Sequence, residues 1–236
     1  MISLDLESPF APRQAIILYQ NENKYYLESH TIYFDQDNKS FLSEGKPLQK
    51  ETIMQIAKQF STDNQLKFTC KQLLPNNLIY VDTQYGNSTF VWFLKPQRNP
   101  LFFTSNLAIP NGQAFCPGLV FVAKNKTLSV FAFRGDIVNL RTKLYIAPFH
   151  NIYKDGKVCL GNAKIENVEG EYENVLTQWQ KIFFGSEFSN LLVNSSPTKT
   201  NINLLWKDLI SNGAKFPVEE LLPHPIKTIK QLIETL

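Results

Sequence analysis

The sequence predicts an α+β fold in which antiparallel strands precede a group of helices. Residues 76–133 contain β-rich runs that pair off around turn residues, and residues 172–236 contain apolar side chains at helical spacing. Ahead of both lies one further amphipathic helix. The predicted order is therefore one helix, four strands in two hairpins, an irregular loop with a cysteine, and C-terminal helices.

The composition indicates a folded, soluble protein. Hydrophobic residues make up 43% and aromatic residues 13% of 236 residues, which is enough for one large domain or two small ones. The 24 basic and 21 acidic residues are scattered, so we expect no nucleic-acid surface. The start of the chain, MISLDLESPF, has no apolar run, and no stretch approaches membrane-spanning length. We therefore expect a cytoplasmic protein without a membrane partner.

The N-terminal part predicts a β-hairpin followed by a helix. Residues 14–34 contain two β-rich runs around the polar turn at 21–23. In residues 48–60, apolar side chains recur at helical spacing, and the polar residues 61–64 end this pattern. We expect residues 1–45 to form a β extension packed on a main domain of residues 46–236.

The strands of the main domain are predicted from two pairs of β-rich runs. Residues 76–84 and 88–96 form the first pair, and residues 118–124 and 127–133 form the second around a turn at Asn125-Lys126. Residues 96–117, which include Pro96 and Pro100, are expected to form a long ordered loop. One more β-rich run, residues 142–148, leads to the cysteine loop.

The C-terminal part predicts three helices. An apolar stripe indicates the first, which could support the loop from behind: Tyr172, Val175, Trp179, Ile182 and Phe183. A polar connection is expected over residues 188–200. Two short helices are then expected at residues 201–210 and 225–236, separated by glycine and proline.

The irregular loop carries the cysteine of greatest interest, Cys159. Gly156 and Gly161 bracket Cys159, and an Asp-Gly turn signal precedes it, so its thiol can face solvent. Asn151 lies eight residues upstream, where a folded-back loop would bring it near the sulfur. The chain has three cysteines without a Cys-x-x-Cys pair, which favours reduced thiols over a disulfide framework or a zinc site.

This loop resembles the active-site loop of ubiquitin-conjugating enzymes. The pattern there is His-Pro-Asn, a short glycine-containing loop, an apolar residue, the catalytic cysteine and leucine. With the cysteine placed on Cys159, the asparagine falls on Asn151, whereas Phe149 and His150 replace His-Pro. Later motifs, W-x-x-x-FF-x-S-x-F and FP-x-x-x-L-x-P, extend the likeness. The chain is thereby similar to the prokaryotic ubiquitin-conjugating-enzyme-like family D, also called PRTRC system protein B.

The resemblance implies a ubiquitin-conjugating-like fold and a reaction. Cys159 would accept a ubiquitin-like protein as a thioester from a ThiF-type activating enzyme and pass it to an amine. Asn151 would donate to the oxyanion or instead pin the loop, with His150, Asp155 and Tyr153 as possible supporting residues. A JAB-type peptidase from the same mobile-element cassette is a further implied partner. No cofactor or metal is expected.

Other interpretations stay open at this stage. Cys159 could be a buried hydrophobic residue. Because Phe149 replaces a histidine that orders the loop, an aromatic side chain must order it by packing, and the chain could be a catalytically silent binding or scaffold protein. A cysteine hydrolase would need a base, for which only His150 offers itself. His150 is more readily a structural histidine, as are His30 and His224, and Asp155 is more often a turn former.

Overall fold

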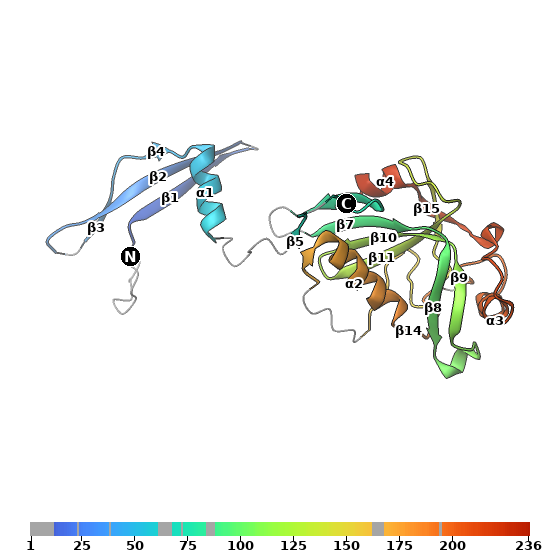
Figure 1. The fold of residues 1–236 in the computed structure, drawn as a ribbon. Helices are drawn as coiled ribbons and strands as arrows, with labels where there is room; N and C mark the ends of the chain where they lie inside the picture. The colour runs from blue at the N-terminus through green and yellow to red at the C-terminus, as the bar shows by residue number, and fades with distance from the viewer. Residues whose placement is uncertain are drawn as a thin grey trace. The chain divides into compact units, whose positions relative to one another are not determined.

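The computed structural model describes residues 12–22, 24–37, 39–60, 68–71, 73–83, 88–161, 168–193 and 195–236. The chain divides into two compact units, Met1–Gln65 and Leu66–Leu236. Each unit combines antiparallel strands with helix, which confirms the predicted α+β class (Figure 1). The first unit includes the helix predicted over residues 48–60. No helix in these described ranges is long and apolar enough to cross a membrane.

The N-terminal unit is built on the predicted hairpin. Strands β1 (Gln14–Asn21) and β2 (Lys24–Phe34) pair antiparallel over the full length of β1. The short strands β3 (Ser40–Leu42) and β4 (Lys46–Pro47) also pair with β2. Helix α1 (Lys50–Phe60) follows, as predicted for residues 48–60. The expected end of this pattern at residues 61–64 lies outside the described residues.

A six-stranded antiparallel sheet forms the centre of the second unit, in the order β15-β12-β11-β10-β7-β6. Its strands are β6 (Leu78–Asp82), β7 (Thr89–Leu94), β10 (Gly118–Lys124), β11 (Thr127–Phe133), β12 (Lys143–Ile146) and β15 (Pro223–Thr228). The pairs β6–β7 and β10–β11 confirm both predicted hairpins, and β7 joins them by pairing with β10. Asn125 adopts a φ of 53° in the second turn, a conformation that asparagine tolerates well.

The long loop expected at residues 96–117 is instead another hairpin. Strands β8 (Gln97–Phe103) and β9 (Gly112–Cys116) pair antiparallel and are joined through the 3-10 helix η1 (Ser105–Leu107). Pro100, which suggested a break, lies within β8. Among the described residues, only Phe102 and Phe103 of β8 pair on its other side, with β14 (Glu187–Phe188), so a proline is tolerated at this edge position.

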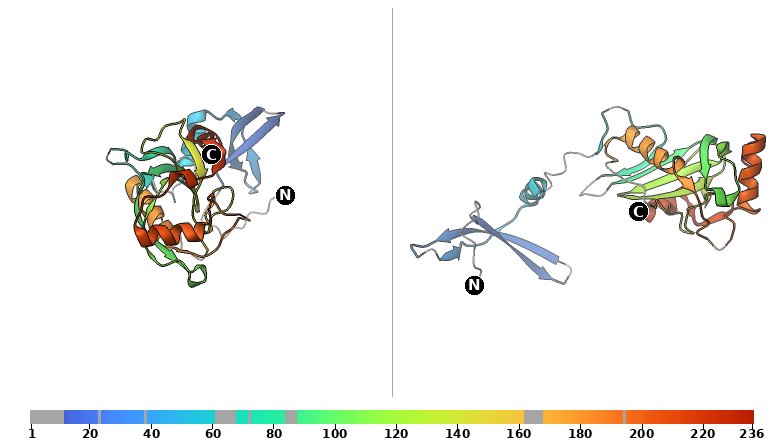
Figure 2. Two further views of the ribbon diagram at one scale, coloured as in Figure 1. Left: turned by 90° about the vertical axis from the view of Figure 1, so that its right-hand side faces the viewer. Right: turned by 90° about the horizontal axis from the view of Figure 1, so that it is seen from below.

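The C-terminal elements cover both faces of the sheet (Figures 1 and 2). Helices α2 (Tyr172–Phe184) and α3 (Ile202–Asn212) confirm two predictions, and the short parallel pair β5 (Phe68–Thr69) and β13 (Gly170–Glu171) precedes α2. The prediction of a helix over residues 225–236 is wrong for the first part of this range, because β15 forms there and pairs with β12. The remainder forms α4 (Ile229–Glu234), and the 3-10 helix η2 (Val218–Glu220) lies between α3 and β15.

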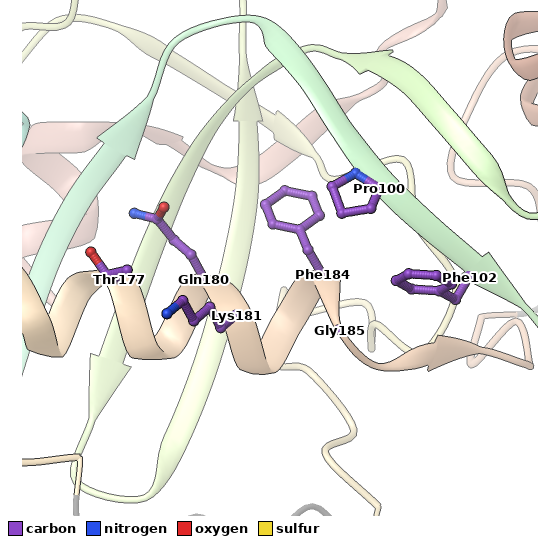
Figure 3. A pocket seen from close by; sticks show the side chains of 7 residues that line it. All are labelled: Pro100, Phe102, Thr177, Gln180, Lys181, Phe184 and Gly185. Carbon is purple, nitrogen blue, oxygen red and sulfur yellow. The ribbon is translucent and has the colours of Figure 1, made fainter.

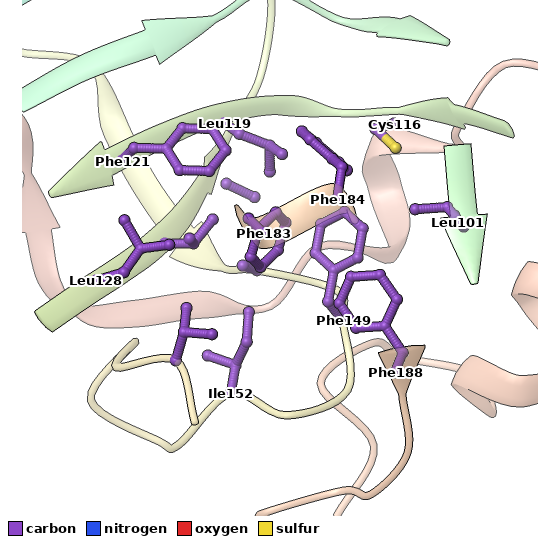
Figure 4. Close-up of a cluster of buried hydrophobic side chains, with 14 of the residues drawn as sticks. Leu101, Cys116, Leu119, Phe121, Leu128, Phe149, Ile152, Phe183, Phe184 and Phe188 are labelled. Atoms are coloured by element: carbon purple, nitrogen blue, oxygen red, sulfur yellow. The ribbon is translucent and has the colours of Figure 1, made fainter. Parts of the chain in front are cut away.

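Successive side chains along the strands point to opposite faces of the sheet, and each face carries its own hydrophobic core. Trp92 and Phe121 stack in the larger core together with side chains of α2 and α3. Val91 and Val120, their neighbours in sequence, lie in the smaller core with Ile229 of α4. The larger core also takes in residues of the cysteine loop, as Figure 4 shows for Phe149 and Ile152. This packing therefore fixes the loop to the sheet.

Candidate active site

The cysteine loop, residues 147–161, folds as a small hairpin. Ile152 and Val158 form a β-bridge, the Tyr153 amide donates to the Lys157 carbonyl over 2.8 Å, and the Cys159 amide donates to the Asn151 carbonyl over 2.7 Å. Ile152 and Val158 are buried in the larger core. Because side chains alternate along an extended arm, Tyr153 and Cys159 point away from that core. Cys159 is exposed, so the interpretation as a buried hydrophobic residue is wrong.

One arm of this hairpin is joined to the sheet. Lys157 forms a bridge with Ser129 of β11, and the Val158 amide donates to the Leu128 carbonyl over 2.8 Å. The Val130 amide donates in turn to the Gly156 carbonyl over 2.8 Å. These main-chain hydrogen bonds attach the arm to β11 in the way that a neighbouring strand would be attached. Cys159 therefore follows directly on a segment that the sheet holds in place.

Asp155 and Gly156 form the tip of the hairpin. The Asp155 carboxylate accepts from the Lys157 amide over 3.0 Å, which is the bond of a turn former. Gly156 has a φ of 90°, and a Cβ atom built on it would lie 2.6 Å from the Phe131 ring. Both the conformation and the close approach require glycine here.

Asn151 fastens the loop to the segment that follows α2. It adopts a φ of 60°, and its side-chain nitrogen Nδ2 donates to the Glu187 carbonyl over 2.8 Å. Its side-chain oxygen accepts from the amides of Ser189 and Asn190 and from the Ser189 hydroxyl, over 3.0 to 3.1 Å. These contacts match the loop-pinning role weighed for Asn151 from the sequence. The sequence offered no signal that residues 187–190 would be its partners.

His150 lies in the core rather than beside the thiol. It is fully buried, its Nε2 lies 2.9 Å from the Asn203 side-chain oxygen, and burial lowers its pKa. Its Nδ1 has no hydrogen-bond partner among the described residues. The ring therefore makes no hydrogen bond to Cys159 in this structure, which removes the one base that the hydrolase interpretation had.

Phe149 orders the loop by packing, as the substitution for histidine led us to expect. Its ring stacks on Phe188 and Trp206, with centroids 5.5 and 5.3 Å away, and meets Phe183 edge to face at 5.3 Å. The Trp206 indole also donates to the Pro148 carbonyl over 2.7 Å. Figure 4 shows Phe149 between Phe184 and Phe188. The entry to the loop is thus held by aromatic contacts with α2 and α3.

Tyr153 lies on the same exposed surface as the thiol. Its pKa is raised, chiefly by a side-chain hydrogen bond with Cys159 and also by the charge of that thiolate, by burial and by the Asp155 carboxylate. The ring itself is 44% exposed. Two of the predicted site residues, Tyr153 and Cys159, therefore lie near enough on this exposed surface for the pKa of the tyrosine to respond to the thiol.

The other cysteines differ from Cys159. Cys116 is buried, and burial raises the pKa of its thiol to about 12, so it is inert as a nucleophile at neutral pH. Cys70 is exposed but lies at the end of the short strand β5, far in sequence from the loop. Within the part of the chain that is described, no group of His, Cys, Asp or Glu could hold a metal ion.

A separate apolar pocket lies between β8 and α2 (Figure 3). Its volume is about 300 Å³, and its lining residues are Pro100, Phe102, Thr177, Gln180, Lys181, Phe184 and Gly185. None of the predicted site residues belongs to it. The candidate site is therefore the open surface around Cys159.

The comparison with protein families decides the family. A model described as prokaryotic E2 family D matches residues 50–224, which include the whole cysteine loop. The chain belongs to prokaryotic E2 family D. This confirms the family predicted from the sequence. No curated protein and no solved structure matches the chain. The E2-like family supports a ubiquitin-conjugating-like role, and the α+β fold is compatible with it.

Proposed function

We propose that this E2-like protein accepts a ubiquitin-like protein on Cys159 as a thioester and transfers it to an amine. One observation carries the proposal: in a chain of an E2-like family, a solvent-exposed cysteine follows a loop arm that is hydrogen-bonded to strand β11 of the central sheet. An acyl carrier needs a thiol that is open to a large partner and yet held in position.

The proposed reaction has two steps. The Cys159 thiolate attacks the acyl carbon of a thioester on the activating enzyme, and the tetrahedral oxyanion collapses to release the enzyme's thiolate. An amine then attacks the Cys159 thioester, and collapse releases the Cys159 thiolate while the amine gives up a proton. A thioester is reactive enough that modest activation of the thiol suffices.

The residues around the sulfur would have different tasks. The Tyr153 hydroxyl is a hydrogen-bond donor on the same exposed surface as the sulfur, near the place where the oxyanion would form. Asn151 commits one of its two side-chain N–H groups to the Glu187 carbonyl, so one remains for the oxyanion. Its main task is to hold the loop, and we assign the larger share of oxyanion stabilisation to Tyr153.

The proposed partners are those that the family resemblance implies. An acyl thioester must be supplied by an ATP-dependent activating enzyme, for which a ThiF-type enzyme is proposed, and the acyl group is the C-terminus of a ubiquitin-like protein. A JAB-type peptidase of the same PRTRC cassette would remove the conjugated protein. These partners remain proposals.

A trapping experiment tests the proposal. The chain is incubated with ATP, the activating enzyme and the ubiquitin-like protein, and the products are separated without reductant. We expect an adduct that reductant abolishes, that Cys159→Ala lacks, and that the matched control Cys70→Ala retains. A stable complex that forms equally well with Cys159→Ala would refute thioester transfer and support a binding or scaffold protein.

A further inference from the structure

His224 joins the tip of the cysteine loop to strand β15. The ring is 4% exposed, and its Nε2 lies 3.2 Å from the Lys154 carbonyl in the loop. Its Nδ1 lies 3.1 Å from the backbone amide of Ile226. The ring also meets Phe131 of β11 edge to face, with centroids 4.8 Å apart. Both ring nitrogens and one ring edge are thus engaged.

These bonds determine the protonation state of the ring. The Ile226 amide can only donate, so Nδ1 must accept and carries no proton. Nε2 must then carry the proton and donate it to the Lys154 carbonyl. A second proton on Nδ1 would face the Ile226 N–H and break that bond. The arrangement therefore fits only the neutral ring.

The ring acts on the same part of the loop that Phe131 supports. Phe131 lies against both Gly156 and His224. The loop bridges to β11, whereas β15 lies beyond β12 in the sheet. His224 thus connects the loop tip to a strand with which the loop does not pair.

We infer that His224 is a positioning residue that holds the tip of the Cys159 loop while its ring is neutral and releases it when the ring is protonated. This inference rests on the proposed function only for the importance of the loop's position. Burial lowers the pKa of His224, and the Asp155 carboxylate on the loop opposes that effect. Phe131, which packs on the ring from β11, carries no charge. Release is therefore expected below the ordinary histidine pKa of about 6.5.

Amide hydrogen exchange measured by NMR tests this inference without any partner protein. Four loop amides with main-chain hydrogen bonds report on the loop: Tyr153, Gly156, Val158 and Cys159. As the pH falls from 7.5, we expect their protection to decrease with the midpoint of the His224 ring resonance. The amides of β10 serve as the control and should keep their protection.

Two variants complete the test. In His224→Gln, the side-chain amide can donate to Lys154 and accept from Ile226, so protection should persist and lose its pH dependence. In His224→Leu, both bonds are lost, and protection of the loop amides should fall about five- to tenfold at neutral pH. Wild-type protection in His224→Leu, or an equal loss in β10, would overturn the inference. A loop that loosens as expected but never accepts an acyl group would refute the proposed function alone.

Discussion

Replacing Gly156 with alanine is expected to destabilise the Leu66–Leu236 unit by about 2–6 kcal/mol. An alanine at φ of 90° costs about 1–3 kcal/mol in backbone strain. The new Cβ would also lie 2.6 and 2.9 Å from two carbons of the Phe131 ring, well inside the 3.5–4.0 Å of an ordinary carbon contact. Phe131 is buried, so moving its ring adds about 1–3 kcal/mol.

Gly161 offers the matched control for this change. It also has a positive φ, 52°, but no atom of the described residues lies within 4 Å of the Cβ that alanine would add. Gly161→Ala therefore carries only the backbone term, about 1–2 kcal/mol. The difference between the two variants therefore contains the contact with Phe131 and the smaller difference between their backbone terms.

Urea unfolding followed by tryptophan fluorescence measures both variants. Trp92, Trp179 and Trp206 are the chain's three tryptophans, and all are buried in the Leu66–Leu236 unit. With a slope of about 2 kcal/mol per molar urea, Gly156→Ala should lower the midpoint by roughly 1–3 M. Equal midpoints for Gly156→Ala and Gly161→Ala would refute the close packing of the loop tip on Phe131.

Three further predictions test the rest of the site. Asn151→Ala should lose about 2–4 kcal/mol of stability, because its side-chain hydrogen bonds are lost. Asn151→Gly should lose about 1 kcal/mol less, because glycine adopts a φ of 60° without strain. Equal losses for the two variants in urea unfolding would contradict the positive φ of residue 151. Tyr153→Phe should slow acyl transfer roughly 10- to 100-fold in a single-turnover assay while leaving stability unchanged, and an unchanged rate would remove Tyr153 from the mechanism. The pKa values of His150 and His224 are lowered by burial, so on acidification the unfolded chain binds protons before the folded chain does. The free energy of unfolding should therefore fall as the pH drops below about 6.5. Replacing both histidines with Gln should flatten this pH dependence, and an unaltered slope would contradict the lowered pKa values.

Local sequence signals predicted the elements that depend on neighbouring residues. Asn125 marked the β10–β11 turn, and the apolar stripe ending at Phe183 marked α2. The exposure of Cys159 was also predicted from its own surroundings, since its flanking glycines lie close to it in the chain. In each case the information lies within a few residues of the element.

The features that sequence analysis missed depend on distant contacts. The local sequence pattern of β15 predicts a helix, but the segment forms a strand because it pairs with β12. Pro100 suggested a loop, but the edge position of β8 tolerates it. The bonds of Asn151 to residues 187–190, and that of His224 to Lys154, likewise join segments that no short motif connects.

The mass of the intact protein after incubation with ATP, a ThiF-type activating enzyme and a ubiquitin-like protein tests the central claim most directly. We predict a species heavier by the ubiquitin-like protein less one water, with the added mass on the Cys159 peptide. Treatment with reductant should restore the original mass. A persistent adduct in Cys159→Ala, or an unmodified wild-type protein while the activating enzyme itself is charged, would contradict the role of Cys159 as the acyl carrier.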